Sequence, residues 1–151
     1  MYTDGASKKN PGIAGIGYVL LENNILIKET GYKLPQQTTN NLAEMLAILV
    51  GLEECLPIIT TSSLLIKSDS LLLINQFNGI YKIKNRAIAE AHKIFKEKYR
   101  KLSITFEHIS RDFNTKADML ANKGIHEDII LPLIYQRLFA SLLISKESLF
   151  N

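Results

Sequence analysis

The order of its predicted elements describes a sheet with helices packed on it, which is α/β or α+β in class. Two apolar runs, Ile13–Leu21 and Ile25–Leu34, are joined by Glu22-Asn23-Asn24 and predict an antiparallel hairpin. Further along, two shorter strands alternate with helical patterns, which is typical of parallel strands joined through helices. The chain has 151 residues, 46% of them hydrophobic, which is enough for one domain with a single core.

The first strand covers Met1–Asp4, so it ends in a carboxylate that we expect to be exposed. Taken alone, Asp4-Gly5 is a strong signal for a hairpin turn. The next apolar run starts only at about Ile13, however, because Lys8–Gly12 intervene. We therefore favour a short strand followed by a loop that lets a ligand approach closely.

Helices and strands alternate through the rest of the chain. A long helix begins at Asn40 or Asn41, either of which could cap it, and ends near Cys55, before Pro57. The elements after it are a strand at Leu64–Lys67, a helix ending at Phe77 before Asn78-Gly79, a basic helix at Arg86–Lys101, a strand at Ile104–Ile109, and a helix at Thr115–Lys123 that Gly124 ends.

The C-terminal segment is expected to pack back on the same core. From Asp128 to Leu143, apolar residues recur at near-helical spacing, the pattern of a buried helix face. The positions that define this face are Ile129, Ile130, Leu133, Ile134, Leu138 and Leu142. We expect residues 1–125 to form the functional domain and residues 126–151 a helical extension packed on it. A partner-binding or dimerising tail is the alternative.

Composition excludes several classes of protein. The longest apolar runs are far too short to span a membrane, and the N-terminus lacks the basic-then-apolar pattern of a signal peptide. The single cysteine, Cys55, rules out an internal disulfide framework and fits a reducing compartment, most simply the cytoplasm. We interpret Cys55 as a buried small apolar residue of the long helix.

The net charge of +3 is modest but unevenly distributed. Between Lys82 and Lys101 the acidic residues are Glu90 and Glu97. The basic residues of this stretch are Lys82, Lys84, Arg86, Lys93, Lys96, Lys98, Arg100 and Lys101. Such a basic helix favours a polyanionic partner, although a solvated helix face is the ordinary alternative.

Four carboxylates occupy positions where an isolated acid is unusual. Asp4 and Asp69 each follow a predicted strand, and if those strands are parallel neighbours the two acids lie side by side at one sheet edge. Glu44 and Asp118 lie within apolar helical stretches, where burying a charge is costly unless a cation or a partner compensates. Either helix could instead turn its acid toward solvent. Four carboxylates without a histidine cluster form an oxygen-ligand set suited to Mg²⁺ or Mn²⁺, and two such ions can bracket a phosphodiester.

Taken in order, these segments resemble the ribonuclease H type 1 family across about Tyr2–Gly124. The segments that carry the resemblance are TDGASKKNPG, TNNLAEMLAILVGLE, SDS followed by INQFNGIYKIKN, and ISRDFNTKADMLAN. The IYKIKN connection is more similar to the archaeal and reverse-transcriptase-associated branch. The resemblance implies the ribonuclease H-like fold, in which three antiparallel strands are followed by parallel ones in a mixed sheet of five. It also implies a metal-dependent endonuclease that cleaves the RNA strand of RNA–DNA hybrids to 3′-hydroxyl and 5′-phosphate ends.

The resemblance also implies roles for individual residues. The catalytic acids and ligands of two Mg²⁺ ions, which Mn²⁺ could replace, would be Asp4, Glu44, Asp69 and Asp118. The residues that would contact the hybrid or its phosphates are Asn10, Thr39, Asn40, Asn41 and Asn85, to which the basic stretch adds Lys82 and Lys84. Among these contacts is the RNA 2′-hydroxyl, the group that distinguishes RNA from DNA. The expected partner is an RNA–DNA hybrid, with no membrane, and the protein is expected to be a cytoplasmic monomer.

The chain departs from the family in ways that bear on function. Only three residues precede Asp4, so the first strand is expected to be shorter than usual. The insertion with a basic handle found in some members is absent, and Gly79–Asn85 connects two helices directly. The loop before Asp118 has no histidine, and Arg111 is the nearest side chain that could act there on phosphate oxygens. A surface arginine paired with Asp112 is the alternative.

Two other functions remain open from the sequence. A catalytically silent nucleic-acid-binding domain of the same fold would have no reason to keep four costly acids. A transposase or exonuclease core of the same superfamily is disfavoured by the short single-domain chain and by the TNNLAE and SDS segments.

Overall fold

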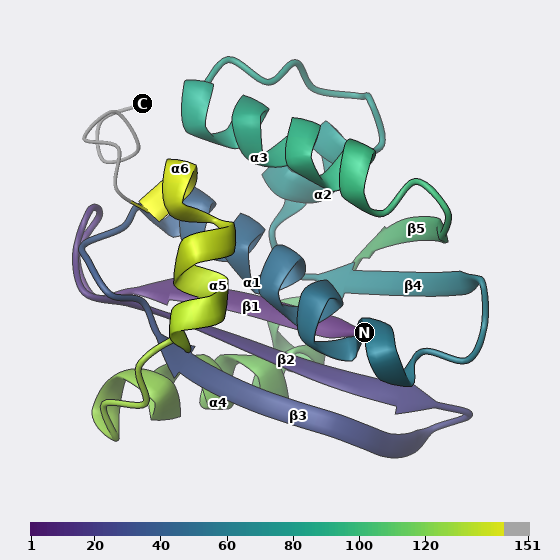
Figure 1. Ribbon diagram of the computed structural model, residues 1–151, viewed down its shortest axis with the longest axis horizontal. Coiled ribbons are helices and arrows are strands. Elements are labelled where there is room, and N and C mark those ends of the chain that lie inside the picture. The colour runs from purple at the N-terminus through teal and green to yellow at the C-terminus, as the bar shows by residue number, and fades with distance from the viewer. Residues whose placement is uncertain (144–151) are drawn as a thin grey trace.

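The computed structural model describes residues 1–143, and it confirms the α/β prediction. The sheet has five strands in the order β3-β2-β1-β4-β5 (Figure 1). The strands are β1 (Tyr2–Ser7), β2 (Ala14–Glu22), β3 (Ile25–Lys33), β4 (Ser63–Ser68) and β5 (Ser103–His108). Successive pairs among β1, β2 and β3 are antiparallel, whereas β4 runs parallel to both β1 and β5. The central strand, β1, is therefore where the antiparallel and parallel halves meet.

Helices cover both faces of this sheet. They are α1 (Asn40–Cys55), α2 (Leu71–Phe77), α3 (Arg86–Lys98), α4 (Thr115–His126), α5 (Leu133–Leu138) and α6 (Ala140–Leu143). Adjacent residues of β2 explain how the two long helices are separated, because successive side chains of a strand point to opposite faces. Tyr18 lies against Gly51 of α1, whereas Gly17 lies against Ala117 of α4. The sheet thus lies between α1 and α4 (Figure 1).

The main core lies between the sheet and α1. Residues 42–52 of α1 are buried with the exception of Glu44, and Cys55 is fully buried as predicted. The hydroxyls of Tyr18 and Tyr32 both donate hydrogen bonds to the Glu54 carboxylate, which ties β2 and β3 to the end of α1. Within residues 1–143, no helix combines the length and the apolar character that crossing a bilayer requires.

The start of the chain differs from the prediction. β1 does not end at Asp4 but continues to Ser7, because Gly5–Ser7 go on pairing with Ala14–Ile16 of β2. Asp4 therefore lies within a strand and is 5% exposed, so the prediction of an exposed carboxylate at a strand end was wrong. The added pairing also anchors the central strand despite its early start.

The basic helix was predicted to reach Lys101, but α3 ends at Lys98. Two further predictions about helix ends were also wrong. The hydroxyl of Thr39, not Asn40 or Asn41, caps α1 by accepting a hydrogen bond from the Leu42 N–H. The prediction that Gly124 ends α4 fails because the helix continues to His126. A side-chain carbon at Gly124 would lie 2.6 Å from the Tyr32 backbone, so this glycine allows close packing and does not mark a terminus.

The C-terminal segment packs through a different set of residues from the predicted face. Ile129–Leu131 is extended beside Lys33, whose N–H donates to Ile129 and whose carbonyl accepts from Leu131. Pro132 then precedes the short helices α5 and α6. Because the segment before Pro132 is extended, a single helical periodicity does not run through it, and a different set of residues is buried. Of the predicted face, Leu142 is buried, and the exposed members are Ile129, Ile130, Leu133, Ile134 and Leu138. The buried residues are Leu131, Phe139, Leu142 and Leu143, while residues 144–151 of the expected extension lie outside the described residues.

Candidate active site

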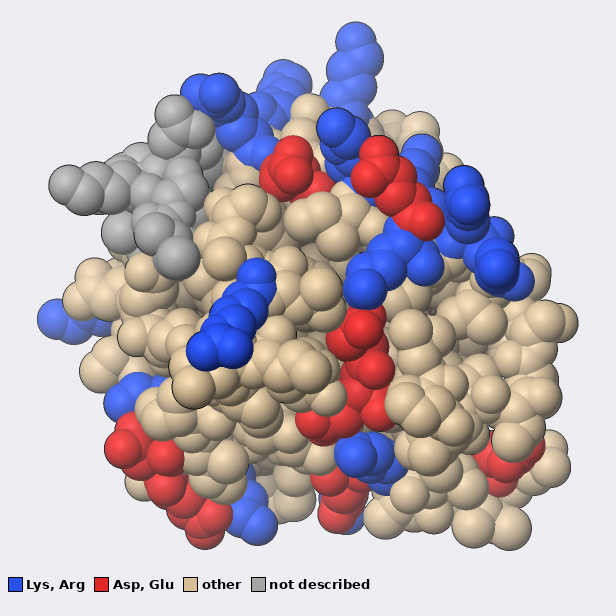
Figure 2. Space-filling model, viewed as in Figure 1, with Lys and Arg blue, Asp and Glu red and all other residues tan. Residues whose placement is uncertain are grey.

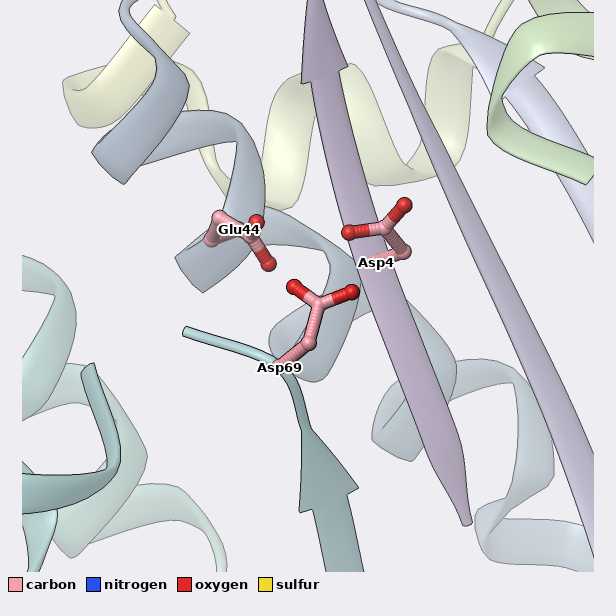
Figure 3. A group of neighbouring side chains, drawn as sticks. All are labelled: Asp4, Glu44 and Asp69. Carbon is pink, nitrogen blue, oxygen red and sulfur yellow. The ribbon is translucent and has the colours of Figure 1, made fainter. Parts of the chain in front are cut away.

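Three of the predicted acids meet beside the C-terminal end of β4. Asp4 comes from β1, Asp69 directly follows β4, and Glu44 comes from the second turn of α1. One carboxylate oxygen from each lies within 4.8 Å of the other two, and the three side chains point toward one another (Figure 3). The parallel pairing of β1 with β4 brings the two aspartates together, as the sequence predicted.

Glu44 reaches this cluster because α1 lies directly on β1. A side-chain carbon at Gly5 would collide with the backbone of Ala43 and Glu44, so glycine is needed for this approach. The nearby Gly5 backbone N–H partly offsets the rise in the pKa of the Glu44 carboxyl. The Oε2 atom of Glu44 is nevertheless buried and has no hydrogen-bond partner. This atom is therefore available to a ligand of opposite charge.

Asp118 lines the same cavity from the first turns of α4. The cavity has a volume of about 420 Å³, and its polar lining residues besides the four acids include Lys8, Asn40, Arg111 and Asn122. A pair of glycines that face each other on β2 and β3 determines how close α4 comes. Side-chain carbons at Gly17 and Gly31 would collide with the carbonyl oxygens of Ala117 and Leu120. Because these two glycines have no side chains, α4 can lie directly on the backbone of β2 and β3, which places Asp118 at the cavity.

Burial and crowding raise the pKa of two of these acids. The pKa of Asp4 rises to about 8, chiefly because the group is buried and then because of the charge on Asp69 and the neighbouring Asp118. The pKa of Glu44 also lies well above its ordinary value, first through burial and then through the charges of Asp4 and Asp69. The cluster therefore favours a bound positive charge, without which it takes up protons.

The residues predicted to contact nucleic acid near the acids lie at the start of α1. The Asn10 side-chain oxygen accepts a hydrogen bond of 3.0 Å from the Asn40 N–H, which joins the β1–β2 loop to this helix. Asn40 also lines the cavity, whereas Asn41 is exposed in the first turn. Thr39 is occupied as the helix cap. The structure thus groups Asn10 and Asn40 beside the acids.

The remaining predicted contacts lie elsewhere. Asn85 caps α3 by accepting a hydrogen bond from the Ile88 N–H, and Lys82 and Lys84 are exposed just before it. None of these three residues lines the acid cavity. Arg111 does line it, and no ion pair within residues 1–143 joins Arg111 to Asp112.

Asn114 is a site residue that the sequence analysis did not single out. It is 1% exposed, and its side-chain amide donates to the Thr3 carbonyl at 2.9 Å and to Asp69 Oδ2 at 3.3 Å. Its backbone carbonyl accepts a hydrogen bond from the Asp118 N–H. Asn114 therefore connects the segments that carry three of the acids. Its position before α4 suggests a helix cap, but its side chain makes no capping bond.

A mixed five-stranded sheet with carboxylates clustered beside its central strand defines the ribonuclease H-like class of domain. The reverse transcriptase-like family matches residues 2–124. Ribonuclease H of Pseudomonas putida (strain W619) is 31% identical over 142 residues, which cover 84% of this chain and 93% of that protein. The bifunctional protein Rv2228c of Mycobacterium tuberculosis is 30% identical over 127 residues, or 81% of this chain. The chain spans only 34% of the length of that mycobacterial relative.

Solved structures show the same architecture. RNase H1 from the archaeon Halobacterium salinarum NRC-1 superposes with a TM-score of 0.78 at 28% identity, covering 83% of this chain and 96% of that one. LC11-RNase H1 in complex with an RNA/DNA hybrid gives a TM-score of 0.79 at 30% identity, covering 84% and 96%. The chain belongs to the ribonuclease H type 1 family.

Proposed function

We propose that this protein is a metal-dependent endonuclease that hydrolyses the RNA strand of RNA–DNA hybrids to 3′-hydroxyl and 5′-phosphate ends. The observation that carries the proposal is the cluster of Asp4, Glu44 and Asp69 within 4.8 Å, with Asp118 lining the same cavity. The similarity to a Pseudomonas ribonuclease H over 93% of that protein supports it. So does the similarity to LC11-RNase H1, which was solved with an RNA/DNA hybrid.

We infer that the four acids hold two Mg²⁺ ions, for which Mn²⁺ can substitute. The buried, unpartnered Oε2 of Glu44 and the raised pKa of Asp4 both fit a site that a cation completes. Every acid donor is an oxygen, which suits these hard cations better than zinc. When bound at such a site, a pair of divalent cations activates water and stabilises the leaving oxygen of a phosphodiester.

Other residues of the cavity would bind and orient the hybrid. Asn10 and Asn40 place amide groups beside the acids, where they could meet the RNA 2′-hydroxyl, and Asn41 and Thr39 adjoin them. A guanidinium binds phosphate oxygens but does not serve as a proton shuttle, so Arg111 would stabilise phosphate oxygens. A loop histidine in its place could do both, because its pKa lies near neutrality.

A basic surface over α3 would extend the contact along the phosphate backbone. Figure 2 shows Lys and Arg side chains gathered over the region that α3 occupies in Figure 1. Asn85 caps the start of this helix, and Lys82 and Lys84 lie just before the cap. The basic residues of the helix and of the segment that follows are Arg86, Lys93, Lys96, Lys98, Arg100 and Lys101. We infer that this surface holds the hybrid outside the acid cavity.

One assay tests the proposed function. Labelled RNA–DNA hybrid, duplex RNA, duplex DNA and single strands are each incubated with Mg²⁺, Mn²⁺ or EDTA. We expect cleavage of the hybrid RNA strand alone, and only with a cation. Tight hybrid binding without cleavage under every condition would instead favour the catalytically silent domain.

The same assay tests the role of Arg111. Arg111→Ala should slow turnover of the hybrid, and its cation requirement should be unchanged. If the variant turns over hybrid as fast as the wild type, Arg111 is an ordinary surface arginine without a role in the reaction.

We further infer that the protein works in the cytoplasm as a monomer, away from membranes. The lone buried Cys55 supports a reducing compartment. Light scattering after gel filtration, at several concentrations and with and without hybrid, measures the oligomeric state. A dimer that persists on dilution would contradict the monomer.

A further inference from the structure

The β1–β2 loop is fastened on both sides of the acid cavity. On the α1 side, Asn10 accepts a hydrogen bond from the Asn40 N–H. On the α4 side, the Lys8 ammonium donates a hydrogen bond of 2.7 Å to Asn122 Oδ1. The loop therefore links the helix that carries Glu44 to the helix that carries Asp118.

Asn122 continues this contact to Asp118, one helical turn before it. Its side-chain amide donates to the Asp118 carbonyl at 2.9 Å and to Asp118 Oδ1 at 3.3 Å. Lys8, Asn122 and Asp118 all line the cavity. The three side chains thus form a chain of hydrogen bonds from the loop to the acid.

The chemistry of the three groups determines how the middle one is turned. An ammonium has only donors, so Lys8 requires the oxygen of the Asn122 amide. The NH₂ of that amide must then face Asp118, whose carboxylate has only acceptors. Without Lys8, the Asn122 oxygen loses its donor, so the amide is held by Asp118 alone and its orientation is less restricted.

We propose that Lys8 is a positioning residue, which acts through Asn122 to hold the Asp118 carboxylate turned into the acid cavity. The inference rests on the proposed function, in which Asp118 is a cation ligand. The hydrogen-bond chain lies near the surface, so it adds little to folding stability. Its effect should appear in cation affinity and turnover, because groups that orient metal ligands control both.

A double-mutant cycle of Lys8→Ala and Asn122→Ala in the full chain tests this coupling. The measurements are Mg²⁺ affinity by calorimetry without nucleic acid, and kcat and KM on the hybrid. We expect each single variant to weaken Mg²⁺ binding and lower kcat by about tenfold, with little change in KM. The double variant should be no worse than either single one, because both break the same chain of contacts. Lys8→Arg, which keeps a charged donor, should recover most of the loss.

The adjacent, exposed Lys9 provides the matched control, because Lys9→Ala removes the same charge from the same loop. We expect wild-type values for it. Equal effects of Lys8→Ala and Lys9→Ala, additive effects in the cycle, or a higher KM with unchanged Mg²⁺ affinity would each overturn the inference. Asp118→Asn is measured in parallel and should lose both Mg²⁺ affinity and cleavage. If Asp118→Asn keeps both, the assignment of Asp118 in the proposed function fails, and the inference fails with it.

Discussion

At the residue scale, substitution of Asp69 should remove catalysis and leave the fold intact. It is partly exposed, and it receives a hydrogen bond from Asn114 that an asparagine in its place can also accept. We expect Asp69→Asn to lower kcat about a thousandfold or more, because the cluster loses a charged ligand. Its thermal stability should hold or rise, because one of several repelling carboxylates is gone. Hybrid cleavage at the wild-type rate in saturating Mg²⁺ would contradict the assignment.

The raised pKa values of Asp4 and Glu44 predict an unusual pH dependence of stability in EDTA. An acid whose pKa is higher in the folded chain binds its proton more tightly there than when unfolded. For Asp4, stability is therefore greatest below the unfolded pKa of about 4 and is lost as pH rises toward its folded pKa of about 8.

Urea unfolding of the wild type and of Asp4→Asn, in EDTA between pH 4 and pH 8, measures this effect. The free energy of unfolding of the wild type should fall relative to that of the variant as pH rises. Saturating Mg²⁺ should reduce the difference, because a bound cation compensates the ionised acids. Parallel curves for the two proteins in EDTA would show that Asp4 titrates normally.

At the scale of elements, the close contact between α4 and the sheet predicts that Gly31 cannot be enlarged. A side-chain carbon there would collide with the Leu120 carbonyl of α4. We expect Gly31→Ala to destabilise the fold by about 1–3 kcal/mol and to weaken Mg²⁺ binding, because α4 must move and carries Asp118 with it. Gly79→Asn serves as the control, since nothing lies within 4 Å of that position and asparagine tolerates its φ of 75°. If Gly31→Ala keeps the wild-type Mg²⁺ affinity, the packing of α4 against Gly31 does not determine the position of Asp118.

The corrected packing of the C-terminal segment predicts which of its side chains stabilise the domain. Phe139 is fully buried, whereas Ile134 is 68% exposed. We expect Phe139→Ala to cost about 3–5 kcal/mol and Ile134→Ala to stay within about 0.5 kcal/mol of the wild type. Chemical denaturation of both variants measures the difference, and the folded fraction of each should still cleave hybrid. If Ile134→Ala lost more free energy of unfolding than Phe139→Ala, the buried face would be the one predicted from the sequence spacing.

At the scale of the whole molecule, a basic surface outside the cavity of the four acids predicts salt-dependent binding. The acids gather in one cavity, and Lys82 and Lys84 begin the basic surface that continues over α3 (Figure 2). If both lysines contact phosphates, Lys82→Ala with Lys84→Ala should reduce the log–log slope of hybrid affinity against salt by about 2. The rate at saturating substrate should change little. An unchanged slope would make this segment an ordinary solvated surface.

Signals local to the sequence determined the elements and their order. The β2–β3 turn forms where Asn23-Asn24 was predicted to make it, with φ values of 51° and 64° that asparagine tolerates. The β2–β3 hairpin was predicted from two apolar runs, and the parallel pairing of β1 with β4 was the arrangement that a right-handed crossover would allow. The resemblance to the ribonuclease H type 1 family implied the mixed sheet of five strands. The order of short motifs also predicted the convergence of Asp4, Glu44 and Asp69. The sequence by itself thus determined the class, the sheet and the acid cluster.

Only the tertiary structure decided the features that depend on contacts between distant residues. Asn114 looks like a helix cap in the sequence, yet its side chain is turned to Thr3 and Asp69. Gly124 looks like a helix end, but it serves the packing of α4 against Tyr32. Pairing of Ile129–Leu131 with Lys33 likewise changed which C-terminal residues are buried. Local patterns do not encode such contacts, because the free energy that selects them comes from partners that only the folded chain brings together.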